Sequence, residues 1–203
     1  MCHTSFWLIV MLGLGGVGAL AFADHAGRLP ILMRLRDTAE VPQHVLTEAQ
    51  EEVTRIYREA GVDILWSTPA SLSAESNAAR QAALTVAILS DDQAERINSA
   101  GMRDAVGFAV RTATEGGRVA YVVYNRVQMI TGGNGLDSAQ GLAIAMAHEI
   151  GHLLLPHNAH SPIGLMRAEW TTADLKLAQR SRLLFTAAQA ELLRSRISVL
   201  PQR

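Results

Sequence analysis

The feature that most constrains the fold is an apolar helical run that begins near Asp137 and reaches Leu155. Its apolar side chains lie around most of the circumference of a helix: Leu142, Ile144, Ala145, Ala147, Ile150 and Leu154. A helix that is apolar on nearly all sides is stable in water only when it is buried on all sides. Asp137 or Ser138 can cap its start, and Pro156 disfavours the helical conformation at the residue before it. We therefore expect a helix that crosses the core and ends by about Leu155.

The residues before this helix predict a sheet with helices packed on it. Residues 31–36 alternate apolar and polar side chains, and residues 62–66 form a second short run, so both segments are predicted strands. Between them, residues 42–60 carry apolar side chains at helical spacing, and Gly61 stands where a helix stop is expected. A strand–helix–strand unit of this kind favours a parallel pair of strands.

Three further strands complete the predicted sheet. Residues 84–89 are continuously apolar, which indicates a central strand that is buried on both faces. Residues 105–112 and 118–124 flank a turn at 114–117 and predict an antiparallel hairpin at the edge of the sheet. The expected fold class is α/β, bordering on α+β, with a mixed twisted sheet of about five strands.

Shorter helices are expected around this framework. Residues 91–98 form one short candidate, and a flexible glycine-rich loop at 132–135 precedes the apolar helix. Residues 171–181 are predicted to be helical. A last helix begins at Thr186, where the pattern Thr-x-x-Gln forms a capping box with Gln189.

The length and charge of the chain limit the classes of function. Its 203 residues suit one domain with a substantial core. The formal net charge of -1 and the pI near 6.7 provide no basic field of the kind that nucleic-acid binding requires. We therefore expect no nucleic-acid partner.

The N-terminal segment predicts export. Residues 6–22 are largely apolar, and Ala21 and Ala23 match the A-x-A pattern of a signal-peptidase site. We expect residues 1–23 to be a signal peptide and residues 24–203 to be a single domain that is secreted or periplasmic. Because no Lys or Arg precedes the apolar run, an uncleaved anchor is the alternative, and a membrane is a partner only in that case.

The apolar helix carries the pattern H-E-x-x-H at His148, Glu149 and His152. Residues four apart lie on one face of a helix, so the two imidazoles can share one metal ion and the carboxylate can reach a water beside it. Burying three ionisable groups without partners would cost several kcal/mol, and a metal ion removes that cost. The only cysteine, Cys2, lies in the predicted signal peptide, so the site cannot use sulfur. We expect the metal to be zinc.

A third ligand is needed, because catalytic zinc usually takes three protein ligands and a water. The sequence after the helix offers four candidates: His157, His160, Glu169 and Asp174. The residue types alone leave the choice among them open.

The segment from His148 to Met166 resembles the metzincin clan of zinc peptidases, and its His-Ser pair looks most like the matrixin branch. The matching residues are His148, Glu149, His152, His160, Ser161, Gly164, Leu165 and Met166. The resemblance implies that His160 is the third zinc ligand and that Met166 lies in a turn beneath the metal.

The connection to His160 departs from the metzincin pattern. That pattern places a glycine three residues after the second histidine and the third histidine three residues beyond it, and these positions are Leu155 and Asn158 here. The chain must leave the helix by another device, which Pro156 and Asn158 can supply because asparagine tolerates the left-handed conformation. We expect a longer connection that still delivers His160. The alternative third ligands are His157 and, as in the gluzincin pattern, Glu169.

The resemblance implies a zinc metalloendopeptidase in which Glu149 is the general base. An extended peptide or protein substrate would bind antiparallel to the edge strand, for which residues 106–111 are the candidate. Tyr121, Tyr124 and His157 are candidates for stabilising the oxyanion. Two other functions stay open: an inactive zinc-containing module that binds peptide or cell-envelope partners, and a zinc hydrolase of a non-peptide amide. The presence of Glu149 argues against the inactive module, which would need no base.

Overall fold

The computed structural model describes residues 28–67, 84–97, 105–111, 118–156 and 158–199 of the chain. The predicted signal peptide, the turn expected at 114–117 and His157 lie outside these residues. Within the described ranges, no helix is long and apolar enough to cross a membrane.

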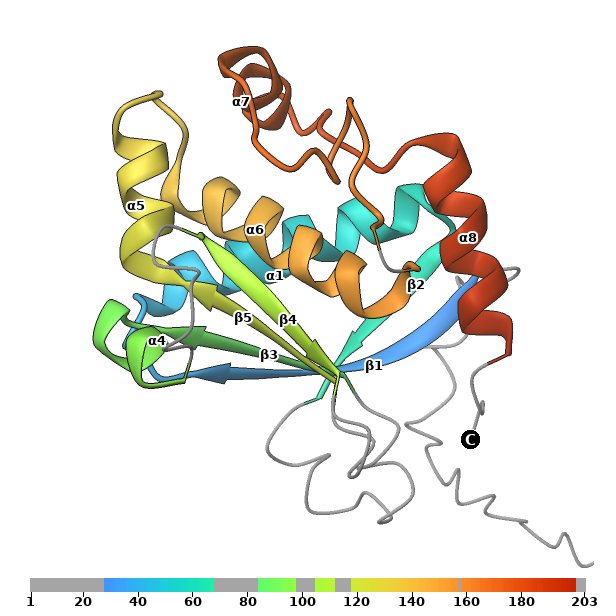
Figure 1. The fold of residues 1–203 in the computed structure, drawn as a ribbon, viewed down its shortest axis with the longest axis horizontal. Helices are drawn as coiled ribbons and strands as arrows, with labels where there is room; N and C mark the ends of the chain where they lie inside the picture. Colours follow the sequence, from blue (N-terminus) through green and yellow to red (C-terminus); the bar gives the residue numbers. More distant parts are fainter. Residues whose placement is uncertain (1–27, 68–83, 98–104, 112–117, 157, 200–203) are drawn as a thin grey trace, which may run out of the picture.

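The strands of the described residues form one mixed sheet, which confirms the expected α/β fold class (Figure 1). They are β1 (Leu29–Asp37), β2 (Val62–Trp66), β3 (Leu84–Leu89), β4 (Gly107–Arg111) and β5 (Arg118–Val123). Their order across the sheet is β2-β1-β3-β5-β4, and every neighbouring pair is parallel except β4 and β5. The predicted parallel pair, the central position of β3 and the antiparallel edge pair are therefore confirmed.

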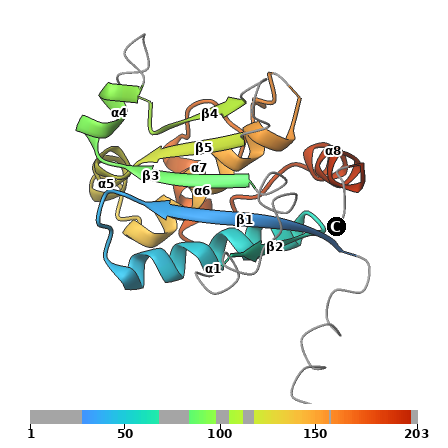
Figure 2. The same ribbon diagram turned by 90° about the horizontal axis from the view of Figure 1, so that it is seen from below.

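The helices lie mainly on one face and at the ends of this sheet. They are α1 (Gln43–Glu59), α4 (Asp91–Ile97), α5 (Tyr124–Gly132), α6 (Ser138–Leu154), α7 (Thr172–Ala178) and α8 (Ala187–Ser198). Helices α1 and α6 pack against each other on the same face, with α6 against β4 and β5 (Figure 1). Figure 2 shows α4 and α8 at opposite ends of the molecule. Helix α7 is shorter than the helix predicted at 171–181.

Helix α6 is the element that crosses the core. The side chains of Met146 and Ile150 have no exposed surface, and most of the helix is buried. The Asp137 carboxylate accepts a hydrogen bond from the backbone N–H of Ala139 at 2.8 Å, which confirms this residue as the N-cap. The helix ends at Leu154, as the proline that follows predicted.

The sequence patterns did not predict α5. The strand expected at 118–124 ends at Val123, and Tyr124 begins the helix with no Gly or Pro between the two elements. Helix α5 packs closely on α6, because Gly141 of α6 leaves space for the side chain of Thr131. Ile130 of α5 thereby contributes to the wall of a cavity described below.

Candidate metal centre

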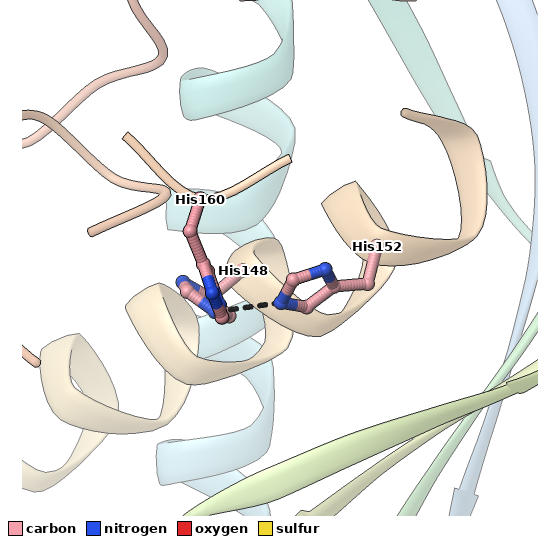
Figure 3. Close-up of side chains that lie close together, drawn as sticks. All are labelled: His148, His152 and His160. Carbon is pink, nitrogen blue, oxygen red and sulfur yellow. Dashed lines mark hydrogen bonds between the residues drawn. The ribbon is translucent and has the colours of Figure 1, made fainter. Parts of the chain in front are cut away.

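Two ring nitrogens face each other on one side of α6. His148 and His152 lie one turn apart, and their Nε2 atoms are 3.0 Å from each other. The ring centroids are 4.7 Å apart, with 73° between the ring planes. Figure 3 shows the two rings meeting beside the helix. The pairing that the H-E-x-x-H pattern predicted is therefore present.

His160 reaches the same point from a separate segment of the chain (Figure 3). Its ring centroid lies 5.5 Å from that of His148 and 4.7 Å from that of His152. Asn158 adopts the left-handed conformation with a φ of 64°, so the connection turns without a glycine, as predicted. One ligand nitrogen from each ring lies within 4.8 Å of the others. The three histidines are close enough to bind a single metal ion.

The backbone carbonyl of Leu165 orients the ring of His148. The Nδ1 atom of His148 lies 2.9 Å from this oxygen, and the indole Nε1 of Trp170 donates to it at 3.0 Å. A carbonyl can only accept, so Nδ1 carries the hydrogen and Nε2 presents its lone pair to the other rings. Burial lowers the pKa of His148 to about 4, although the hydrogen bond to Leu165 acts in the opposite direction. The ring is therefore neutral at pH 7, which is the form that binds a metal.

The Glu149 carboxyl lies between α6 and the edge strand. Its residue is 8% exposed, and burial raises the pKa of the carboxyl to about 8. A Cβ atom at Gly107 of β4 would lie 2.6 Å from Cγ of Glu149. Glycine at this position thus lets the side chain of Glu149 lie against the strand. Sequence reasoning missed this contact, although a glycine inside a strand often marks the close approach of another group.

The side chain of Met166 packs against α6 at Gly151, the residue directly before His152. Its side chain is fully buried, and a Cβ atom at Gly151 would lie 2.6 Å from its sulfur. Gly164, with a φ of 78°, makes the turn that precedes it. The backbone N–H of Leu165 donates to the carbonyl of Leu184 at 2.8 Å. The carbonyl that orients His148 is therefore itself held in place by the core.

The remaining candidate ligands do not join this group. The Asp174 carboxylate accepts hydrogen bonds from the backbone N–H and the hydroxyl of Thr171 at 2.8 and 2.6 Å, in the capping box of α7. Glu169 is exposed and lines the neighbouring cavity. Of the residues that the structure describes, the group whose ligand atoms meet contains only the three histidines. The geometry favours His160 over Glu169 and Asp174 as the third ligand.

A cavity of about 1000 Å³ opens beside the three histidines. Its described walls include residues 105–109 at the edge strand, the C-terminal part of α5 and residues 167–170. Strand β4 is hydrogen-bonded to β5 on one side, and no described strand lies on its other side. Tyr121 and Tyr124, which were candidates for stabilising an oxyanion, are not among the described residues that line the cavity.

The donor set suits zinc and related transition-metal ions. Neutral imidazole nitrogens are good ligands for zinc, copper, iron and nickel, whereas magnesium and calcium prefer oxygen. The Nε2 atoms of His148 and His152 are 3.0 Å apart and share one hydrogen bond, and a metal ion would replace its proton so that both nitrogens present lone pairs to the ion. Zinc as the particular metal stays a prediction.

No protein-family model and no curated protein matches the chain. The metzincin resemblance of residues 148–166 therefore stays a prediction from the motif.

Proposed function

We propose that the protein is a zinc-dependent peptidase in which His148, His152 and His160 hold the metal and Glu149 is the general base. The observation that carries the proposal is the convergence of three imidazoles next to a buried carboxyl, beside a cavity. When bound, zinc would polarise the scissile carbonyl and lower the pKa of a water to about 7.

Glu149 would move the proton in this reaction. Water adds to the carbonyl carbon of the substrate, its proton passes to the Glu149 carboxylate, and the carboxyl returns a proton to the departing amine as the C–N bond breaks. The carboxyl must be ionised to act as a base, and a cation held by the adjacent histidines would favour that form. Gly107 supports this role, because it gives the side chain of Glu149 room beside the edge strand.

The substrate that best fits the site is an extended peptide. Among the described strands β4 is the last in the sheet, so its outer side would offer backbone N–H and C=O groups to a substrate strand, and the cavity beside it can take side chains. Binding along residues 106–111 would carry a peptide bond past the histidines. The N-terminal segment supports action outside the cytoplasm, in a secreted or periplasmic location.

The alternatives predict different reactions. A zinc-containing binding module without catalysis would hold the metal and bind peptide or envelope partners without turnover. A hydrolase of a non-peptide amide would use the same histidines and the same base on another substrate. Glu149 favours the two hydrolases, since a purely structural zinc site needs no base.

The test combines metal analysis with peptide hydrolysis. We expect about one zinc per chain, lost in His148→Ala, His152→Ala and His160→Ala but kept in the control His44→Ala, an exposed histidine on α1.

Glu149→Ala should keep the zinc and lose hydrolysis, whereas Glu48→Gln, at an exposed position, should keep both. Full zinc content in His160→Ala would refute the third ligand. If the zinc-loaded protein cleaves small amides but no member of a peptide library, the hydrolase of a non-peptide amide is favoured.

A further inference from the structure

The side-chain amide of Gln189 forms hydrogen bonds to two separate segments of the chain, one through its oxygen and one through its nitrogen. At the start of α8, its Oε1 accepts from the backbone N–H of Thr186 at 3.0 Å, and its own backbone N–H is 3.3 Å from the Thr186 hydroxyl. These two contacts form the capping box that the sequence predicted. The Nε2 group, however, donates to the carbonyl of Ala159 at 3.1 Å and to the hydroxyl of Ser161 at 3.0 Å.

The two acceptors flank His160, one on each side. The segment around His160 belongs to no helix or strand, and Asn158 before it has a positive φ. A metal ligand on such a segment needs contacts that fix its backbone, because freezing an irregular backbone is opposed by conformational entropy. The backbone N–H of Ser161 supplies one such contact, since it donates to the carbonyl of Met166 at 2.9 Å. Gln189 supplies the two contacts that come from α8.

Gln189 is also buried, with 7% of its surface exposed. Water therefore replaces its hydrogen bonds poorly, and a change at this residue is transmitted to its partners. Of its three side-chain bonds, one belongs to the helix and two belong to the segment that carries His160. This division makes the two roles separable by experiment.

We propose that Gln189 is the positioning residue for the third metal ligand, and that it couples the first turn of α8 to metal binding. The inference rests on the proposed metal site, specifically on His160 as a ligand, and does not depend on which reaction the site catalyses. With the amide in place, the Ala159–Ser161 segment holds the His160 ring toward the other two rings. Without the Nε2 donor, His160 keeps its place in the chain but loses its fixed orientation.

The variant that separates the two roles is Gln189→Glu. A carboxylate accepts from the Thr186 N–H as an amide does, and glutamate is as suitable as glutamine at this position of a capping box. A carboxylate cannot donate, however, so it would face the carbonyl of Ala159 with a second acceptor. The matched control is Thr186→Ala, which removes the hydroxyl from the capping box and leaves both bonds to the His160 segment.

The experiment measures zinc and cobalt affinity of the full-length protein by competition with a chelator. We expect Gln189→Glu to bind about 10- to 100-fold more weakly than wild type, the usual effect of losing a partner that orients a ligand. Thr186→Ala should bind as wild type does, even though α8 is less stable in this variant. In the visible spectrum of bound cobalt, we expect a changed coordination in Gln189→Glu and none in Thr186→Ala.

Ser161→Ala provides a second route, in case Gln189→Glu does not fold. It removes one of the two acceptors of Gln189, together with the hydrogen bond that the Ser161 hydroxyl donates to the carbonyl of Ile163 at 2.7 Å, and should lower the affinity by a smaller factor. Coupling gives an independent readout, because a ligand that is stabilised by α8 must in turn stabilise α8. Zinc should slow amide hydrogen exchange in the first turn of α8 in wild type, and much less in Ser161→Ala.

The possible failures are distinguishable. Wild-type affinity in both Gln189→Glu and Ser161→Ala would overturn the positioning role while leaving the metal site intact. A wild-type protein that binds neither zinc nor cobalt would overturn the metal site and this inference together. An equal loss of affinity in Thr186→Ala and Gln189→Glu would show that only the stability of α8 matters, which would also overturn the positioning role.

Discussion

Gly107 lies directly against Glu149: a Cβ atom at this position of the strand would be only 2.6 Å from the Glu149 Cγ atom, too close for both to fit. The same Cβ would lie 2.6 Å from the backbone oxygen of Tyr121 on the neighbouring strand. The proposed base is therefore held between a helix and a strand that contains a glycine at the point of contact.

Gly107→Ala should separate metal binding from catalysis. The added methyl group must displace Glu149, so we expect zinc content to be retained and kcat/KM for a peptide to fall by about 100-fold or more, the usual range for a misplaced general base. Overpacking should also lower the free energy of unfolding by about 1–3 kcal/mol. The control is Gly132→Ala, where a Cβ atom meets nothing within 4 Å. Wild-type turnover in Gly107→Ala would contradict this role of the contact.

Trp170→Phe should weaken metal binding modestly. The phenylalanine ring keeps the apolar bulk, but the carbonyl of Leu165 loses one of its two donors, and His148 is then oriented less firmly. We expect a loss of about 1 kcal/mol in the free energy of unfolding and a decrease in zinc affinity of about 10-fold or less. Trp66→Phe is the matched control. It also removes an indole hydrogen bond of 3.0 Å, to the hydroxyl of Thr54, but it does so in a part of the molecule that contains no proposed metal ligand. Equal affinities in the two variants would argue against the orienting role.

Tyr57→Phe should change stability but not metal content. The fully buried Tyr57 hydroxyl donates to the carbonyl of Ala147 on α6 at 3.0 Å, and burial raises the pKa of this phenol well above its ordinary value. Removing the hydroxyl leaves a buried acceptor with one partner fewer, which costs about 1 kcal/mol in urea unfolding. Zinc stoichiometry should stay at the wild-type value. A Tyr57→Phe protein that loses zinc would show that the bond positions the histidine helix as well as stabilising it.

Asp174 should contribute stability that disappears in acid. Burial acts to raise the pKa of its carboxyl, but the hydrogen bonds from Thr171 and the nearby Arg167 guanidinium more than offset this, so the pKa lies below the ordinary value of 3.8. Between the folded and the unfolded pKa, the unfolded chain binds more protons than the folded protein. The stabilisation is therefore fully present above about pH 4 and is lost as the pH falls through the folded pKa. Asp174→Asn should be less stable than wild type at pH 7, and the difference should shrink as the pH is lowered below 4. A difference that is constant with pH would refute the assignment to the ionised carboxyl.

Features that depend on neighbouring residues were predictable from the sequence. The burial of α6 follows from its apolar circumference, its start from Asp137, and its end from Pro156. The pairing of His148 with His152 follows from helix periodicity. The arrival of His160 was predicted from resemblance and from the conformational tolerance of Asn158, which does have a positive φ.

Features that depend on contacts between distant segments were not predictable in this way. Helix α5 follows β5 with no Gly or Pro between them, so the sequence pattern wrongly extended the predicted strand to Tyr124. The capping box of Gln189 was visible in the sequence, but its bonds to the segment of His160 join residues about thirty positions apart. The contact of Gly107 with Glu149 likewise arises only when β4 packs against α6.

The burial of α6 also has a consequence for dynamics. Helices at the centre of a core have no local opening route, so their amide hydrogens exchange only when the whole domain unfolds. The turn that carries His148 and His152 belongs to this helix, whereas His160 is exposed at the surface. Slowest exchange should therefore be found at the proposed catalytic motif itself, and any motion that admits substrate must come from the segments around it.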